Sequence, residues 1–378
     1  YLLSKEEVIE KGVPESAAMN YVRMYYTRCF GIQSWLSDEL ACYTFPTVAF
    51  PVTFQQAQVM LKAHYKGVDK LDQSQRETLQ QVEDNISKAI TNTDSSTTSK
   101  EVGSSSSSIK NTDASSKINS SLGFFIKLDT RSPKDVTVYD FDNAHVQNLI
   151  SKCIDEIPMN ERNENSEMIA FVKATNMAMK LHSAKQAMDL LLRSTRISED
   201  LSKQVQFSEK FFKVSIILRQ WMDEVAERPQ YEFRGFVHNK KLNALSQYFC
   251  FNYYQDLVER KQEIEKLIRD FYDTKVKQHI DHDSYVIDFY VTKDNRVFII
   301  ELNPFHTGAG PCLFTWRENR DLFMNGPFEF RIVDSVPEKP DDVMPIQWRR
   351  WITAKYPDTP RQQQQTIQQQ QQQQQTWG

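Results

Sequence analysis

The sequence lacks the features that mark several common classes of protein. Its five cysteines are widely spaced and form no CxxC pair or Cys/His cluster, which argues against a disulfide framework or a structural zinc site. No apolar run is long enough to cross a bilayer. Lys and Arg (46) do not outnumber Asp and Glu (50), and the net charge of −4 argues against a protein that mainly coats nucleic acid or anionic membranes. We therefore expect a cytoplasmic protein without direct binding to nucleic acid or membrane.

Large aromatic residues are missing from one long stretch. No Phe, Tyr or Trp occurs between Lys66 and Gly123, and residues 84–121 are rich in Ser, Thr and Asn. Such a segment cannot offset the entropy lost when its backbone is ordered, so we predict a disordered insertion at 84–121. A phosphorylated regulatory loop is the alternative. The mostly glutamine segment from Arg361 to Gly378 is predicted to be a disordered tail.

The remaining sequence is rich in aromatic residues. The chain has 23 Phe and 15 Tyr, although only 40% of its residues are hydrophobic and its mean hydropathy is −0.58. Removing the two polar segments leaves about 300 residues, which suits a two-lobed fold. Helical periodicity is followed by β-rich runs, which predicts an α+β fold with two subdomains around a cleft. The predicted helices lie at 16–43, 54–61, 165–182, 184–193 and 255–275, an extended segment is predicted at 44–54, and the predicted strands lie at 123–128, 211–218, 231–237, 242–247, 285–292 and 296–303.

The last predicted hairpin carries two carboxylates. Centring its loop between Asp294 and Asn295 places Asp288 directly opposite Glu301, and Asn303 falls on the same strand face. Opposed carboxylates repel and weaken a sheet, so a positive group is expected between them. Two carboxylates and an amide oxygen suit Mg²⁺. The alternative is that Asp288 is solvated and Glu301 pairs with a Lys or Arg.

Three cationic positions could bind nucleotide phosphates or a purine. Lys127 interrupts an apolar strand, and its alternative is to extend to the surface. Arg234 lies two residues from Glu232 on one strand face, so its alternative is an internal salt bridge. Arg219 and Trp221 end a buried strand where an apolar wall could hold a flat purine, or where Trp221 only packs the strand end.

Together and in order, these segments resemble the cell division cycle protein 123 family, whose members have an ATP-grasp fold. The matched segments are Phe45-Pro46 to Pro51, Lys127 with Pro133-Lys134-Asp135, Asp189 with Leu190–Leu192, Leu218–Trp221, Glu232-Phe233-Arg234 with Phe236-Val237, Ser246-Gln247, Asp288, Glu301 with Asn303-Pro304-Phe305, and Leu313-Phe314-Thr315-Trp316. The E-F-R, E-x-N-P-F and L-F-T-W strings are specific as a set.

The resemblance implies an ATP and Mg²⁺ site between two α+β subdomains. Lys127 would contact the phosphates and Arg234 would reach the phosphate side. The segment Arg219, Gln220 and Trp221 would line the adenine pocket. The Mg²⁺ ligands implied are Asp288, Glu301 and Asn303. The division implied is 1–83 for the N-terminal part of an ATP-grasp-like domain, 84–121 for the insertion, 122–345 for the rest of that domain with its nucleotide and metal site, and 346–378 for a C-terminal extension with the Gln-rich tail.

The resemblance also implies a partner. Family members are assembly chaperones for eukaryotic translation initiation factor 2, which bind its gamma subunit and promote its joining with the alpha subunit, supporting cell-cycle entry. The alternative is an ATP-grasp enzyme, a ligase or kinase, whose Gly308–Gly310 loop approaches a phosphate or acceptor. The sequence departs from the family pattern at Gln220, Asp129–Arg131, Tyr248 and His306–Cys312.

Two further expectations concern the chain as a whole. No internal repeat is present, and no feature requires an oligomer, so we expect a monomer. The sequence begins at Tyr1 rather than Met, which leaves an N-terminal signal open.

Overall fold

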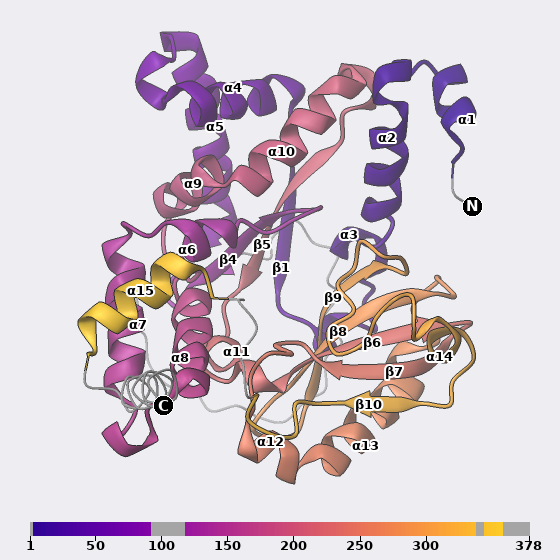
Figure 1. Cartoon of the computed structure of the whole chain (residues 1–378). Coiled ribbons are helices and arrows are strands. Elements are labelled where there is room, and N and C mark those ends of the chain that lie inside the picture. Colours follow the sequence, from indigo (N-terminus) through magenta and orange to yellow (C-terminus); the bar gives the residue numbers. More distant parts are fainter. Residues whose placement is uncertain (1–2, 92–117, 338–343, 358–378) are drawn as a thin grey trace, which may run out of the picture.

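The structure, a computed structural model, describes residues 3–91, 118–337 and 344–357 (Figure 1). Its architecture is mixed α+β, as the sequence predicted. The described strands form a three-stranded sheet, a five-stranded sheet and a two-stranded ladder. Within these ranges, no helix combines the length and the apolar character that spanning a bilayer requires.

The three-stranded sheet is antiparallel, and its order is β1 (Thr47–Val52), β5 (Val214–Gln220) and β4 (Phe124–Leu128). Pro51 is tolerated in β1 because this strand lies at the edge of the sheet. The next residues start a helix through a capping box: the Thr53 hydroxyl accepts from the Gln56 backbone N–H at 3.1 Å, and the Gln56 side chain accepts from the Thr53 N–H at 2.9 Å. The predicted extended segment and helix cap are confirmed.

Helices cover one face of this sheet, namely α4 (Phe54–Lys66), α5 (Gln73–Ala89), α9 (Ala184–Arg193) and α10 (Thr195–Gln204) (Figure 1). Side chains alternate along β5, so Ile216 and Leu218 are buried beneath these helices while Arg219 points to the other face. Lys127 on β4 pairs with Ile217 and therefore shares that second face with Arg219.

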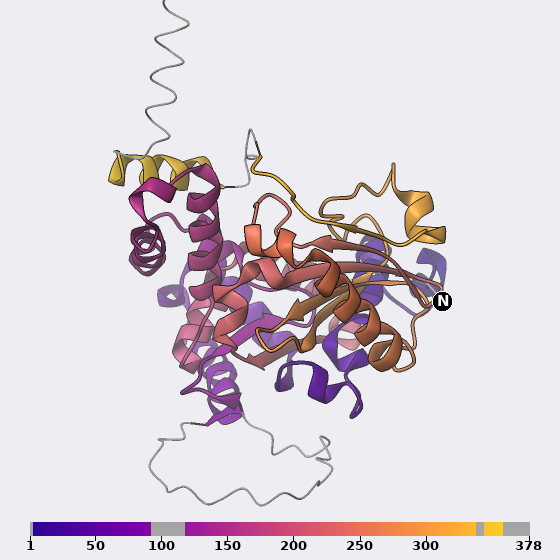
Figure 2. The same ribbon diagram turned by 90° about the horizontal axis from the view of Figure 1, so that it is seen from below.

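The five-stranded sheet has the order β10 (Glu329–Arg331), β7 (Lys241–Gln247), β6 (Glu232–His238), β8 (Tyr285–Val291) and β9 (Val297–Pro304). β10 runs parallel to β7, and the other pairs are antiparallel. Figure 2 shows α12 (Gln255–Glu259) and α13 (Lys261–Phe271) lying across one face, where Phe233 and Phe289 pack against Ile264 and Ile268. Phe236 and Val286 face the other way and contact α14 (Arg320–Asn325).

A third group of helices packs around Trp348. It comprises α6 (Asp135–Tyr139), α7 (Ala144–Asp155), α8 (Glu164–Met177) and α15 (Ile346–Lys355), and α11 (Asp223–Glu227) adjoins α8. Trp348 is fully buried, and its Nε1 donates to the Val138 carbonyl at 2.7 Å. The first ten residues of the expected C-terminal extension, 346–355, are therefore part of the packed fold. The predicted disordered tail from Arg361 lies outside the described residues.

The predicted disordered insertion is wrong at both ends. Residues 84–89 continue α5, and β2 (Ile90–Thr91) pairs in parallel with β3 (Ile118–Asn119). Leu79, Val82 and Ile86 recur at helical spacing and are buried, so aliphatic residues supply the core that aromatic residues do not. The central part of the prediction, residues 92–117, lies outside the described residues.

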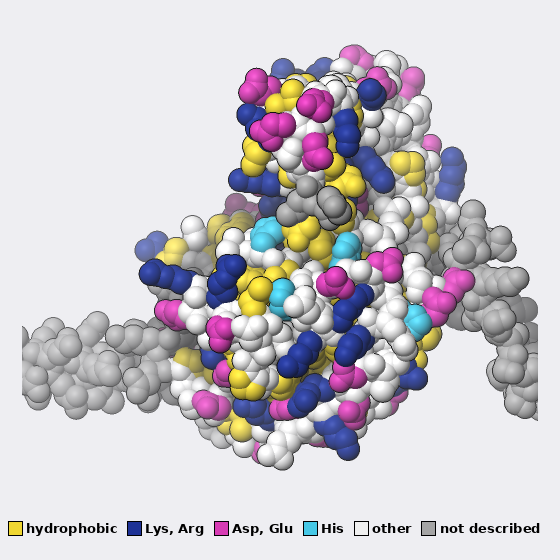
Figure 3. Space-filling model, turned by 90° about the vertical axis from the view of Figure 1, so that its right-hand side faces the viewer, with side chains coloured by type: hydrophobic (Ala, Val, Ile, Leu, Met, Phe, Trp, Pro, Cys, Tyr) yellow, Lys and Arg dark blue, Asp and Glu magenta, His cyan; other side chains and the backbone are white. Residues whose placement is uncertain are grey.

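Two long predicted helices are broken in the structure. The segment 16–43 forms α2 (Glu15–Arg28) and the short α3 (Ile32–Trp35), preceded by α1 (Lys5–Glu10), and residues 255–275 form α12, α13 and a π-helical turn at Tyr272–Val276. α2 and the residues just after it contact segments that flank the five-stranded sheet: the Tyr26 ring stacks on His306 with centres 6.0 Å apart, and the Phe30 ring stacks on His282 with centres 4.3 Å apart. Figure 3 shows histidines and apolar side chains gathered on this side of the molecule.

Candidate functional site

The candidate site lies on the face of the five-stranded sheet that points away from α13. β6 pairs Arg234 with Asp288 on β8, and β8 pairs Asp288 with Glu301 on β9. Asn303 follows two residues later on the same face. One row of polar side chains therefore crosses three strands, and the predicted opposition of Asp288 and Glu301 is confirmed.

A β-bulge produces this opposition. Nearer the turn, Phe289 pairs with Ile299, so a regular ladder would place Asp288 opposite Ile300. The register shifts by one residue between Phe289 and Asp288, which leaves Ile300 as the extra residue and brings Glu301 opposite Asp288. The turn is centred on Asp294 rather than between Asp294 and Asn295, half a residue earlier than predicted, and the bulge compensates for that error.

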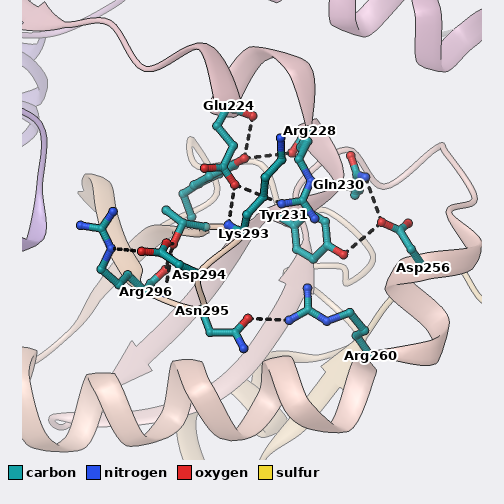
Figure 4. A network of polar contacts seen from close by, with 12 residues as sticks. Glu224, Arg228, Gln230, Tyr231, Asp256, Arg260, Lys293, Asp294, Asn295 and Arg296 are labelled. Carbon is teal, nitrogen blue, oxygen red and sulfur yellow. Dashed lines mark hydrogen bonds and ion pairs between the residues drawn. The ribbon is translucent and has the colours of Figure 1, made fainter.

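The turn between β8 and β9 is held in place by polar contacts with α11 and with the start of α13 (Figure 4). The Lys293 backbone N–H donates to Glu224 Oε1 at 2.5 Å, and Arg260 Nη2 donates to Asn295 Oδ1 at 2.7 Å. The guanidinium carbons of Arg228 and Arg260 lie 4.1 and 5.2 Å from the centre of the Tyr231 ring. These contacts join β8 and β9 to α11 and to the start of α13, which fixes the strands that carry the site.

Arg234 and Asp288 form a buried bidentate ion pair. Arg234 Nε lies 2.8 Å from Asp288 Oδ1 and Nη2 lies 2.7 Å from Oδ2, and the two side chains are 8% and 1% exposed. Arg234 Nη1 also donates to the Gly310 carbonyl at 3.0 Å, and its guanidinium lies 4.9 Å from the Tyr248 ring centre. The two alternatives, a salt bridge from Arg234 to Glu232 and a solvated Asp288, are both wrong.

Lys127 joins the two sheets. Its Nζ lies 2.9 Å from Glu301 Oε2, with the two side chains 16% and 35% exposed. Lys127 therefore does not extend to the surface. Glu301 does pair with a lysine, which was the alternative to a metal at this position. Arg219 lies beside this pair: its Nη1 donates to the Ile300 carbonyl at 2.5 Å and its Nη2 to Thr44 Oγ1 at 2.6 Å.

Asn303 lies between the two carboxylates. Its Nδ2 is 3.3 Å from Glu301 Oε1 and 3.5 Å from Asp288 Oδ2. Within the described ranges, no group of three or more His, Cys, Asp and Glu side chains is arranged to hold a metal ion. The donor set nevertheless fits Mg²⁺ if Asn303 turns its amide to present oxygen, because Glu301 is partly exposed and Asp288 Oδ2 faces the same space.

Charge in the site is closely balanced. Burial acts to raise the pKa of Glu301, but Lys127 and Arg234 outweigh it and lower this pKa to about 2. Burial raises the pKa of Asp288, and the Arg234 guanidinium, which contacts both carboxylate oxygens, acts against this rise. Burial acts to lower the pKa of Arg234, but the Asp288 charge outweighs it and raises this pKa. Burial, with Asp288 nearby, raises the pKa of Glu232 to about 8.

The segment expected to hold adenine is divided between two faces. Arg219 contacts the site, with its guanidinium 4.7 Å from the Phe45 ring centre, and burial lowers its pKa to about 10. Gln220 points the opposite way, where its Nε2 donates to the Gly123 carbonyl at 2.6 Å. Trp221 packs against the edge of the core beneath the three-stranded sheet, and its Nε1 donates to Asp223 Oδ1 at 2.9 Å. The structure brings six predicted residues together and leaves the side chains of Gln220 and Trp221 outside: the six are Lys127, Arg219, Arg234, Asp288, Glu301 and Asn303.

Three residues without a predicted role adjoin the site. Glu232 and the exposed Lys134 interact electrostatically with each other and with the acidic row, and the half-buried Tyr248 ring lies against Arg234. Glu232 could have been found, because it lies two residues before Arg234 and so shares its strand face. Lys134 comes from the segment after β4, and no local pattern places it there.

Fold and site together define an α+β protein whose two sheets meet at a buried cluster of paired charges. A family model described as D123 matches residues 168–373, more than half of the chain, and the chain belongs to this family. The match runs beyond Ile346, into the segment expected to be a C-terminal extension.

Named relatives agree with this family. The chain is 30% identical over 210 residues to "Cell division cycle protein 123" of Candida glabrata, covering 55% of this chain and 50% of the relative. It is 35% identical over 103 residues to "Translation initiation factor eIF2 assembly protein" of Dictyostelium discoideum, covering 27% of this chain and 26% of the relative. The chain thus spans half or less of the length of these relatives. The solved structure of Cdc123 from Schizosaccharomyces pombe superposes with a TM-score of 0.51 at 20% identity, covering 89% of this chain and all of that one, which shows a shared fold.

Proposed function

We propose that this protein is an ATP- and Mg²⁺-binding assembly chaperone for eukaryotic translation initiation factor 2. It would act in the cytoplasm, bind the gamma subunit and promote its joining with the alpha subunit. The names of its relatives support a role in eIF2 assembly. The cluster of paired charges where the sheets meet supports a nucleotide site and an ATP-grasp-like arrangement.

The ion pair between Lys127 and Glu301 is the observation that carries the proposal. It spans the two sheets at 2.9 Å, and one partner is positive and the other negative. A bound Mg²⁺ neutralises charge on the phosphates. Lys127 would exchange Glu301 for a phosphate oxygen, and Glu301 would then face the cation together with Asn303 and Asp288. After this exchange Lys127 would be paired with the phosphate and Glu301 with the cation, so neither charge would be left unpaired.

The other residues have supporting roles in this proposal. Arg234 pairs with Asp288 and would also lie beside the phosphates. Arg219 orients the bulged strand by donating to the Ile300 carbonyl. The Arg219–Trp221 segment would border the adenine through Arg219 and the backbone. Because Lys127 and Glu301 belong to different sheets, nucleotide binding would fix the relative position of the lobes and so shape a surface for the gamma subunit.

The Gly308–Gly310 loop bears on the alternative of a ligase or kinase. Arg234 donates to the Gly310 carbonyl, Trp316 Nε1 donates to the Ala309 carbonyl at 2.7 Å, and Ala309 is buried. The loop is therefore held by the protein itself rather than open to an acceptor. This favours the assembly role over catalysis.

A pull-down tests the proposed partner. The chain should retain the isolated gamma subunit at micromolar protein in the presence of Mg-ATP, and the Glu301→Gln variant should retain less. A charge-neutralising control far from the site is Glu227→Gln, on the exposed face of α11. Absence of retention by the wild type refutes the chaperone proposal. Turnover of ATP above the Glu301→Gln level with a defined acceptor would instead support an enzyme.

A further inference from the structure

A second pocket, separate from the charge cluster, opens between α2 and the segment that leads into β5. Its volume is about 440 Å³, within the range of ligand-binding pockets, and it shares no lining residue with the site described above. Its lining includes four aromatic and three cationic side chains, namely Tyr21, Tyr25, Phe211, Phe212, Arg28, Lys210 and Lys213.

The aromatic side chains form a preassembled apolar wall. Tyr21 stacks on Tyr25, with ring centres 6.3 Å apart, and meets Phe211 edge-on at 5.8 Å. Tyr25 is 37% exposed although it is a large apolar residue, and Tyr21 and Phe211 are half-buried. Tyr21, Tyr25 and Arg28 recur at positions i, i+4 and i+7, so one stripe of α2 supplies half of the wall. Phe211 closes the opposite side.

The charge of the pocket is of one sign. No carboxylate lines it, and within the described residues none of Arg28, Lys210 and Lys213 forms an ion pair. Arg28 is fixed in place because its Nη1 donates to the Lys213 carbonyl at 2.7 Å and to Gln204 Oε1 at 3.3 Å. Burial lowers the pKa of Arg28, and the charge of Asp129, which does not line the pocket, acts against this shift. Lys210 and Lys213 are exposed at the rim.

We propose that this pocket docks an acidic peptide segment of a protein partner, with one aromatic residue of the segment packed against the exposed side of Tyr25. Flanking Asp or Glu side chains would pair with the two rim lysines and Arg28, which supplies charge complementarity. A peptide with one aromatic residue fits better than single-stranded nucleic acid, because stacking of successive bases needs several free rings, whereas Tyr21 is already stacked and edge-packed and Tyr25 alone of the two tyrosines is exposed. The proposal does not depend on nucleotide binding.

Fluorescence anisotropy of the full chain with labelled nine-residue peptides tests it. The probe has a central Trp flanked by Asp and Glu. One comparison peptide has Ala in place of Trp, and a second has Asn and Gln in place of the acids. We expect the probe to bind, each comparison peptide to bind at least tenfold more weakly, and binding to weaken as salt rises from 0.1 to 0.5 M.

Protein variants locate the binding. Lys210→Glu with Lys213→Glu should weaken the probe at least tenfold, whereas the matched pair Lys152→Glu and Lys185→Glu, exposed on α7 and α9, should not. Tyr25→Ala should reduce binding of the Trp probe but not of its Ala counterpart. Circular dichroism confirms that each variant is folded.

Three results would overturn the proposal. The first is no binding of the probe at millimolar concentration, and the second is equal loss in both charge-reversed pairs. The third is that an eight-nucleotide RNA, or a second copy of the chain measured by sedimentation, binds more tightly than the acidic probe, and that Lys210→Glu with Lys213→Glu abolishes this binding. Mg-ATP binding measured on the same variants should be unchanged, so failure here and failure of the nucleotide proposal are distinguishable.

Discussion

Replacing Arg234 by methionine should destabilise the protein by about 3–5 kcal/mol, because it leaves a buried carboxylate without its counter-charge. Arg234 contacts both Asp288 oxygens at 2.7–2.8 Å, and the carboxylate is 1% exposed. An exposed pair would contribute only about 0–1 kcal/mol, so the magnitude tests burial as well as pairing.

Urea unfolding at pH 7, followed by circular dichroism, measures this loss. A double variant, Arg234→Met with Asp288→Leu, removes both charges and should recover at least half of it, since a buried ion pair replaced by apolar residues is often neutral in stability. Asp288 also supplies a pH test. Without Arg234, burial keeps its folded-state pKa above the unfolded value of 3.8, so the penalty is largest at high pH. The stability gap between wild type and Arg234→Met should narrow from pH 7 to pH 5.

Either of two results would refute this reasoning. One is a loss below about 1 kcal/mol, the value for exposed pairs. The other is a gap that stays constant or widens as the pH falls, which would mean that Asp288 is not a buried, ionised group in the variant.

Three further predictions concern stability. Trp348→Ala should lower the free energy of unfolding by about 3–5 kcal/mol, measured by urea titration, because the side chain is fully buried and its Nε1 donates to Val138; an effect below about 1 kcal/mol would show that α15 is not part of the core. Thr53→Ala should cost about 1 kcal/mol by the same measurement, through loss of the cap on Gln56, and Thr53→Ser should restore it. The pKa of Glu232 is about 8 in the folded state against 4.5 unfolded, so its ionisation lowers the free energy of unfolding increasingly as pH rises between these values. Glu232→Gln should therefore lose less stability than wild type from pH 5 to pH 9, measured by thermal unfolding. The same pH dependence of stability in both proteins would contradict the assignment.

The hairpin shows what the sequence can and cannot predict. Alternation of side chains placed Asp288, Glu301 and Asn303 on one face correctly, because that pattern depends only on the two-residue repeat of a strand. The bulge at Ile300 was not predictable, since nothing distinguishes this residue from Ile299 in an apolar run. The bulge also presents the Ile300 carbonyl to Arg219, a contact that links the two sheets and has no sequence signal.

The same alternation could have corrected one site prediction. Arg219 and Gln220 are consecutive residues in a strand, so their side chains point to opposite faces and only one can face the site. The predicted insertion is too wide for a different reason. Absence of aromatic residues does not mean absence of a core, because Ile86 continues the buried aliphatic stripe that Leu79 and Val82 begin on α5. Long-range partners, such as Lys134 near Glu232, depend on how the lobes pack and not on local pattern.

Calorimetric titration with Mg-ATP tests the central claim most directly. The wild type and the charge-matched control Glu227→Ala should bind Mg-ATP with the same affinity, because Glu227 is exposed and remote from the paired charges. Glu301→Ala and Asp288→Ala should each weaken binding at least tenfold, about 1.4 kcal/mol, and the loss should be smaller for ATP without Mg²⁺. Equal affinity of all four proteins for Mg-ATP would contradict the assignment of Asp288 and Glu301 to a metal and nucleotide site.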